Sequence, residues 1–155
     1  MTKDEVLEWA KQGRSLARCD LSGLDLSGVD LRKADLAGAI LSSTNLERAV
    51  LEGADLRGAD LSNARLSRAN LRGARMDGAG LEGADLSSAS LQGSRMAGVD
   101  LEKATACGAD MREADLSGAS LEGANLTGSV LAQADLSGVD WTRAILAKAD
   151  LTGAL

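Results

Sequence analysis

Residues 54–63 read ADLRGADLSN, which is one five-residue phrase written twice in succession. The phrase holds a small residue, a polar residue, a central Leu and two hydrophilic residues, and it repeats without a break from Cys19 to Gly153. Of the 27 central positions, 22 are Leu and three are Met. Such strict periodicity is typical of a solenoid, in which each repeat packs only against its neighbours.

The spacing of the central residues excludes an α-helix and indicates a coiled, extended chain. At roughly 100° per residue, successive central residues would be rotated by about 140° around a helix. Residues two apart in an extended chain share a side, so Ala54 and Leu56 are predicted to point inward and Asp55 outward. Gly ends 16 of the units, which suits a turn with left-handed dihedral angles. Stacked coils about 4.8 Å apart would then pair their backbones as parallel ladders.

The phrase ADLRG at residues 54–58 resembles the consensus of the pentapeptide-repeat family, A-(D/N)-L-x-x, and the resemblance covers Cys19–Gly153. It implies an all-β fold, a right-handed quadrilateral parallel β-helix with four pentapeptides per coil. Spacing alone predicts a coil, and the number four comes from the resemblance. Residues 20 apart would then stack on one face. One such column holds only glycine: Gly38, Gly58, Gly78, Gly98, Gly118 and Gly138.

The N-terminal residues predict a short helix that caps the solenoid. Thr2 and Glu5 have the spacing of a helix capping box, and apolar residues follow them. Because the end of a solenoid exposes core residues and unpaired strand edges, we expect a capping helix over Thr2–Gln12, with Trp9 or Leu7 on the first coil. The alternative is an amphipathic helix that binds a partner.

At 155 residues the chain is expected to form one domain, with a lead-in over residues 1–18 and the β-helix over residues 19–155. There is no His and no Pro, and Cys19 and Cys107 would lie roughly 20 Å apart at the ladder spacing, too far for a disulfide. No apolar run approaches the length of a membrane span, and the N-terminus has no signal-peptide h-region. We therefore expect a cytoplasmic protein without a membrane segment.

The composition argues against catalysis and against cofactor binding. Nucleophile–His catalysis needs a His, and the usual zinc sites need more than two distant cysteines. No phosphate-binding or dinucleotide-binding motif is present. The 13 Asp residues that precede central positions are expected to bond neighbouring backbone amides, and a filled core offers no pocket that would shift their pKa. We expect no enzyme activity, no cofactor and no metal, and the net charge of −6 disfavours direct nucleic-acid binding.

Charge is concentrated in the second half of the chain. Met76–Leu155 holds five basic and twelve acidic residues, a net charge of −7. In the four-sided coil Glu82, Glu102 and Glu122 would form an acidic column whose like charges repel, which makes them a candidate interaction surface. On another face Arg32, Glu52, Arg72, Gln92 and Arg112 would stack, and the first three are predicted to form an exposed ladder of ion pairs.

The C-terminal coil is the second candidate interaction surface. The chain stops in mid-phrase, so the last coil is expected to lack its fourth side. Leu136, Trp141, Leu146 and Leu151 would lie at an edge with unpaired backbone groups, and no Pro or charged tail protects it. We therefore expect Trp141 and its neighbours to contact a second copy of the chain, end to end.

Two classes of function fit these features. The first is a non-catalytic structural scaffold that binds a protein partner, either alone or as a domain of a longer protein. The second follows from the resemblance, because some family members mimic DNA and bind a type II topoisomerase such as gyrase. In this chain the acidic half would supply the mimicking face. Those relatives are typically dimers paired at the C-terminus, and some carry projecting loops, which the unbroken repeat lacks.

Overall fold

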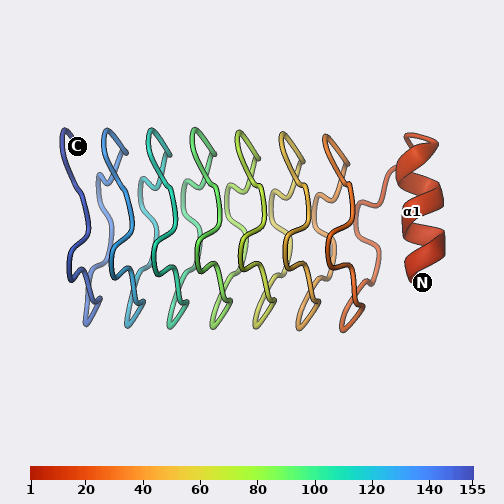
Figure 1. Ribbon diagram of the computed structural model, residues 1–155, viewed down its shortest axis with the longest axis horizontal. Coiled ribbons are helices and arrows are strands. Elements are labelled where there is room, and N and C mark those ends of the chain that lie inside the picture. The colour runs from red at the N-terminus through yellow and green to blue at the C-terminus, as the bar shows by residue number, and fades with distance from the viewer.

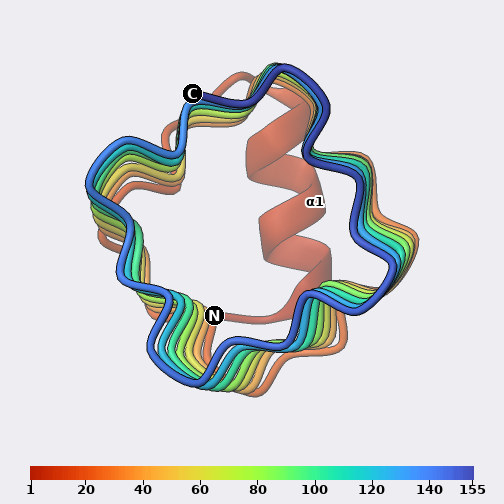
Figure 2. The ribbon, with the colours of Figure 1, turned by 90° about the vertical axis from the view of Figure 1, so that its left-hand side faces the viewer.

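The computed structural model describes every residue from Met1 to Leu155 and shows a straight stack of coils. Helix α1 (Lys3–Lys11) lies at one end of the stack and the C-terminus at the other (Figure 1). Seen along the stack, the coils superpose on a roughly square outline, and α1 lies across the N-terminal end of the stack (Figure 2). The one helix has nine residues, too few to span a membrane.

Neighbouring coils are joined by parallel bridges between residues 20 apart. They run in unbroken sequence from Asp20↔Ile40 to Val130↔Asp150. This register confirms the four pentapeptides per coil that the resemblance implied. Each bridge is a single residue, so the faces are built from isolated contacts separated by turns, and no longer strand forms.

Every repeat turns a corner through one residue with a positive φ, two positions after the centre. Gly58 has a φ of 61° there and Gly118 a φ of 67°. Twelve other residues occupy the same position, among them Arg68 with a φ of 58°. The excess of Gly at this position therefore has the predicted cause, since a side chain in the left-handed region costs free energy.

The hydrogen bonds of one unit explain the polar residue before each centre. In the unit centred on Leu56, four of the five backbone amides donate to backbone carbonyls. Those of residues 56 and 58 donate to the next coil, that of residue 55 donates to the preceding coil, and that of residue 54 donates to Leu51. The fifth amide, of Arg57, donates to Asp55 Oδ1 at 3.2 Å. The Asp side chain thus accepts a hydrogen bond from the one amide of the unit that has no backbone acceptor.

The same side-chain bond occurs at every Asp and Asn that precedes a central residue. In each case the Oδ1 atom accepts from the backbone amide two residues on, at 2.9 to 3.3 Å. The acceptors are Asp20, Asp25, Asp30, Asp35, Asn45, Asp55, Asp60, Asn70, Asp85, Asp100, Asp110, Asp115, Asn125, Asp135, Asp140 and Asp150. The expectation that these carboxylates bond backbone amides is confirmed.

The core is one continuous column of 44 buried apolar residues, formed by the central residues, the small residues two positions before them, and Val6 of α1. Three polar side chains are buried among the small residues. Thr44 Oγ1 donates to the Leu21 carbonyl at 2.9 Å, whereas the hydroxyls of Ser94 and Ser129 have no partner. Cys19 and Cys107 are free thiols.

Helix α1 closes the N-terminal end of this column. The predicted capping box is present, because Thr2 Oγ1 accepts from the Glu5 amide and the Glu5 carboxylate accepts from the Thr2 amide. The helix lies one residue inside the predicted range at each end. The residue that it buries fully is Val6, while Leu7 and Trp9 are only partly buried against the core.

The ladder begins one unit earlier than the repeat phase indicated. Leu16 is buried, and its amide donates to the Asp35 carbonyl at 2.8 Å. Counted from Leu16, the last coil completes its circuit: the Leu155 carbonyl accepts from the Leu136 amide at 3.1 Å. The expectation that this coil lacks its fourth side is wrong, because counting from Cys19 omitted the unit around Leu16.

Candidate interaction surfaces

The acidic column of Glu82, Glu102 and Glu122 lies on successive coils of one face, as predicted, but basic side chains reach it. The amide of Lys103 donates to the Glu122 carbonyl, which fixes the register of these coils. Lys103 Nζ lies 2.6 Å from Glu102 Oε1 and 3.8 Å from Glu82 Oε1. Arg143 forms an ion pair with Glu122. Each glutamate therefore has a cation beside it, which offsets the repulsion expected from the column.

Lys103 is held as a cation by this arrangement. Its pKa is raised above the ordinary value, first by the hydrogen bond to Glu102 and then by the charges of Glu102, Glu82 and Glu122. The ammonium group is exposed, so each pair contributes little to stability. The column is best described as a strip of alternating charge with an acidic excess.

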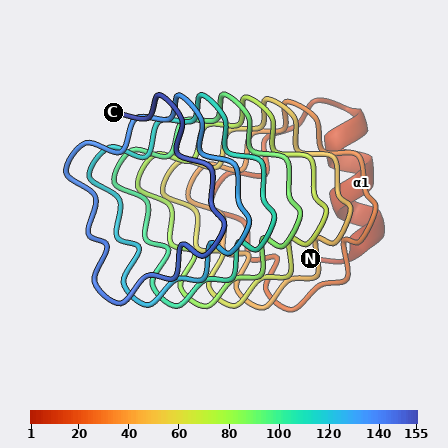
Figure 3. The same ribbon diagram turned by 60° about the vertical axis from the view of Figure 1, so that its left-hand side comes forward.

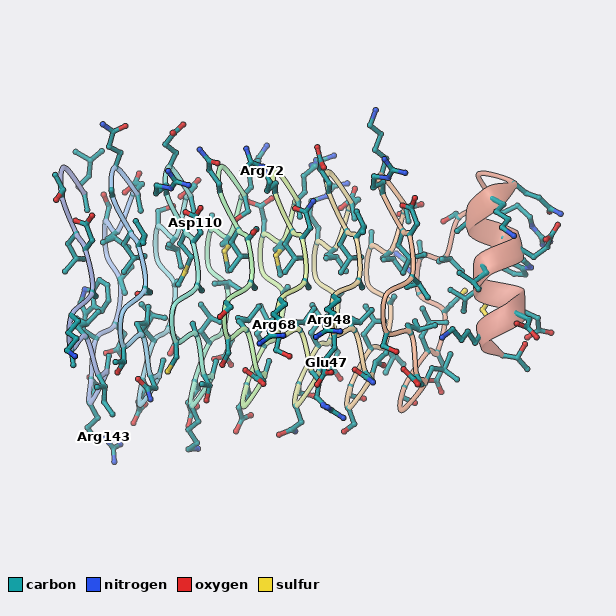
Figure 4. All side chains as sticks on the ribbon, viewed as in Figure 1. Glu47, Arg48, Arg68, Arg72, Asp110 and Arg143 are labelled. Carbon is teal, nitrogen blue, oxygen red and sulfur yellow. The ribbon has the colours of Figure 1, made fainter.

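Lys103 and Arg143 were not among the residues predicted for this surface. Their positions in the repeat would have indicated these ion pairs. In the 20-residue register, each lies one residue after the position that the column of glutamates occupies. Lys103 directly follows Glu102, and Arg143 is 21 residues after Glu122. Arg143 projects from the solenoid near the C-terminal end (Figure 4).

The ladder of ion pairs predicted for Arg32, Glu52 and Arg72 does not form. Arg32 instead binds Asp30 of its own unit, with Nη2 and Oδ2 2.6 Å apart, and this bond lowers the Asp30 pKa to about 2. Glu52 accepts a bond from the Asn70 amide group at 3.3 Å. A carboxylate two residues away in the same turn is nearer than one in the next coil, about 4.8 Å further along the stack.

The first half of the solenoid mixes basic and acidic side chains. Arg48 and Arg68 lie on adjacent coils near Glu47, and Arg72 lies at the opposite margin of the view (Figure 4). Glu47 forms an ion pair with Arg65. Unlike the acidic second half, this half of the solenoid has no excess of acidic or basic residues, because the net charge over Cys19–Arg75 is zero.

The C-terminal coil exposes apolar side chains, but the prediction is wrong for Leu136, which is buried and whose amide donates to the Leu155 carbonyl. Trp141 and Leu146 are half-buried, and Leu151 is 40% exposed. Ile145 and Leu155, at 50% and 80% exposure, enlarge this apolar end beyond the residues that the sequence analysis selected. They were missed because Ile145 takes an outward position of the repeat and Leu155 follows its last complete unit.

The same coil ends the backbone ladder. The amides of Trp141, Leu146 and Leu151 have no acceptor. Their counterparts one coil earlier all donate to this last coil, for example Leu121 to the Asp140 carbonyl at 2.8 Å. The C-terminal end thus combines an apolar surface with unpaired backbone donors, the two features of an edge that recruits another chain.

Solved structures with the same repeat were found by comparison with this chain. HetL, a pentapeptide repeat protein involved in heterocyst differentiation regulation from the cyanobacterium Nostoc sp. strain PCC 7120, is 33% identical, with 87% of this chain and 75% of HetL covered and a TM-score of 0.39. Rfr23 from the cyanobacterium Cyanothece 51142 is 28% identical, with 65% and 63% covered and a TM-score of 0.47.

A third structure supports the fold alone. Trypsin-treated QnrB1, a plasmid-mediated fluoroquinolone resistance protein, is 24% identical, with 84% of this chain and 72% of that chain covered and a TM-score of 0.57. No curated protein matches the chain. The family profile for pentapeptide repeats matches residues 15–53, 54–93, 84–123, 94–131 and 124–154. Since these segments span nearly all of the sequence, the chain belongs to the pentapeptide repeat family.

Proposed function

We propose that this protein is a non-catalytic scaffold for protein–protein interaction, and that its C-terminal coil associates with the same coil of a second copy. The observation that carries this proposal is the edge at Trp141, Leu146 and Leu151, where apolar side chains and unpaired amides occur together. A rigid column with a filled core supplies a fixed platform for such an edge. We expect the protein to act in the cytoplasm, with free thiols suited to a reducing compartment.

Self-association at this edge is favoured because the edge carries both donors and acceptors. Besides the free amides, the carbonyls of Ala144 and Ala149 accept no hydrogen bond. A two-fold axis brings donors of one copy opposite acceptors of the other, which an isologous interface requires. Helix α1 lies across the opposite end of the stack and leaves no room for a whole coil there, so the last coil of one copy does not stack on the first coil of another (Figure 3). The expected product is a closed dimer.

We also infer that the coil is the right-handed, four-sided β-helix that the resemblance implied. The 20-residue register supports four sides. Viewed from the C-terminal end, the chain advances toward the reader in a counter-clockwise sense, which supports the right-handed winding (Figure 2).

Sedimentation velocity over a range of concentrations tests the proposed dimer. The unchanged protein is expected to shift from monomer to dimer as concentration rises, and Trp141→Glu is expected to remain monomeric because it buries a charge at the contact. Ile40→Glu is the matched control, since Ile40 is an exposed apolar residue near the capped end. A strict monomer at high concentration, or equal effects of the two variants, would contradict the proposal.

The second candidate function is DNA mimicry toward a type II topoisomerase, and the charge of −7 over Met76–Leu155 favours it. The cations beside Glu82, Glu102 and Glu122 lower the charge density of the most regular acidic column, so we place the mimic second. A pull-down from native cytoplasm discriminates the two. Recovery of a topoisomerase, lost in a Glu102→Gln/Glu122→Gln variant and retained in Trp141→Glu, would favour the mimic.

A further inference from the structure

A groove separates helix α1 from the first coil of the solenoid. Two adjacent hollows, of about 370 and 350 Å³, make up this groove and share three lining residues, Ala10, Arg32 and Ala34. Its apolar lining consists of Leu7 and Ala10 of α1 and Ala34 of the coil, which are partly exposed, whereas Leu31 beneath them is only 1% exposed. The groove therefore lies between α1 and the edge of the first coil.

Cations without partners line this groove. Arg32 is bound by Asp30, but Lys11, Arg14 and Lys33 take part in no ion pair, although the protein as a whole has a net charge of −6. The Arg14 guanidinium lies over the Trp9 ring at 3.8 Å from its centroid and stays exposed. Asp35, the other carboxylate of the groove, already accepts a bond from the Ser15 hydroxyl at 2.5 Å. The groove thus attracts negative charge.

The backbone at the base of the groove is an open ladder edge. The amides of Asp30 and Asp35 and the carbonyls of Asp30 and Arg32 have no hydrogen-bond partner. One coil later the equivalent groups are paired: the Val50 amide donates to the Val29 carbonyl and the Val50 carbonyl accepts from the Leu31 amide, both at 2.8 Å. An extended chain laid beside residues 30–32 would complete the same pattern there, whereas the position beside Asp35 is already taken by Leu16.

We propose that this groove binds a short extended segment of a partner protein that carries acidic side chains around one apolar residue. The segment would add to the ladder edge through Asp30 and Arg32, place its apolar side chain against Leu7 and Ala34, and present its carboxylates to Lys11 and Lys33. Backbone pairing supplies the binding mode, and the apolar floor and the cations supply the selectivity. This site lies at the opposite end of the molecule from the proposed dimer contact, so the two can be tested separately.

The test uses the full chain and a capped peptide of sequence EAELE, titrated while backbone amides are followed by nuclear magnetic resonance. The amide of Asp30 is expected to shift, because it gains an acceptor. A capped KAKLK peptide and free glutamate serve as comparisons and are expected to leave this amide unchanged. Equal binding of KAKLK, shifts caused by free glutamate alone, or a peptide that perturbs only the C-terminal coil would overturn the proposal.

Charge variants give the second arm of the experiment. Lys11→Glu with Lys33→Glu is expected to weaken binding of EAELE by roughly tenfold or more, since two attractive contacts become repulsive. Lys148→Glu is the matched control, because Lys148 takes the same left-handed position of the repeat as Lys33, with φ values of 59° and 57°. Circular dichroism checks that all variants stay folded. A folded double variant that binds EAELE as well as Lys148→Glu would also overturn the proposal.

Discussion

At the scale of single residues, the carboxylate of Asp60 accepts two hydrogen bonds from Ser62, one from the backbone amide at 2.9 Å and one from the hydroxyl at 2.6 Å. Without this carboxylate the Ser62 amide has no acceptor within the repeat. Outward positions are usually tolerant of substitution, yet this one completes the hydrogen bonding of its turn. The preference for Asp and Asn before each centre is therefore a backbone requirement and does not by itself mark a binding site.

Replacing Asp60 tests this requirement. Asp60→Ala is expected to lower the free energy of unfolding by about 1 kcal/mol, because a turn amide loses its acceptor. Asp60→Asn keeps an oxygen acceptor and is expected to cost much less. Val50→Ala, at the same repeat position but without such a bond, is the control. Urea unfolding measures all three, and equal losses for the Ala and Asn variants of Asp60 would count against the explanation.

These carboxylates also predict how stability depends on pH. The pKa values of Asp20, Asp135, Asp140 and Asp150 lie below 3.8 because the hydroxyl and then the amide two residues on stabilise the charged form, and Arg32 lowers the Asp30 pKa to about 2. Between the lowered pKa values of the folded state and the ordinary pKa of about 4 in the unfolded state, the folded state therefore binds fewer protons than the unfolded state. Stability from these groups is present above about pH 4 and is lost as pH falls toward 2.

Urea unfolding at successive pH values checks this expectation. The midpoint should stay nearly constant from about pH 7 to 5 and fall steeply below about pH 4. Asp30→Asn should make the fall shallower, because its group no longer titrates. A midpoint that rises on acidification would show that repulsion among the acidic residues outweighs these bonds.

The buried hydroxyls of Ser94 and Ser129 supply a third test at this scale. Each replaces an Ala of the core column and has no hydrogen-bond partner, which costs roughly 1–3 kcal/mol for a buried polar group. Ser129→Ala is therefore expected to raise the free energy of unfolding. Thr44→Val should lower it, because the Thr44 hydroxyl is bonded to the Leu21 carbonyl. A loss of stability in Ser129→Ala would show that its hydroxyl has a partner in solution.

At the scale of the repeat unit and the helix, the sequence predicted most of what is regular. The inward Ala and Leu positions, the left-handed turn and the capping box at Thr2 and Glu5 follow from local rules that each unit repeats. The ion pairs did not follow, because an Arg such as Arg32 can reach either Asp30 in its own turn or Glu52 one coil away. The repeat pattern shows that both carboxylates are within reach of Arg32, but it does not indicate which of the two Arg32 binds.

The groove beside α1 shows the same limit for the site. The sequence predicted a helix that covers the first coil, but not how much of the coil it would cover. Val6 is the residue that enters the core, which leaves Leu7 and Ala10 to line an open groove beside the first coil. That outcome depends on the angle and position of one short helix, which no repeat pattern encodes.

Ala106 tests the packing of a single unit. It is the smallest central residue, is 3% exposed, and lies in the column between Leu86 and Leu126. Ala106→Leu is expected to be neutral or stabilising, because a larger side chain restores contacts along the column. Leu126→Ala is the reference, with an expected loss of about 2–5 kcal/mol. If Ala106→Leu lost more than about 1–3 kcal/mol in urea unfolding, neighbouring residues would already fill the site.

At the scale of the whole molecule, the two ends of the stack differ in what covers them. Helix α1 buries Val6 against the first coil, whereas Trp141 and Leu151 leave the last coil open. An assembly made through the open end alone stops at two copies. One short helix therefore decides between a closed dimer and an open series of copies.

Deleting α1 tests this role. Removal of residues 1–12 is expected to let the last coil of one copy stack on the first coil of another, so that sedimentation shows assemblies that grow with concentration. Trp141→Glu in the shortened chain should suppress this growth. The shortened chain must retain the circular dichroism of the repeats for the comparison to hold. A folded, shortened chain that stops at dimers would show that α1 does not limit assembly.

The 20-residue register also has a consequence for how such a protein can change over generations. Duplication of the segment that encodes one coil lengthens the rod by about 4.8 Å and leaves every surviving residue on its own face. Loss of a single five-residue unit keeps Leu beneath Leu throughout the column, yet it rotates everything beyond the cut by a quarter of a circuit. Glu122 would then no longer follow Glu102, and a new combination of charges would meet on each side. A lineage with this architecture can therefore recombine its outer surface in quarter-turn steps while its interior stays the same.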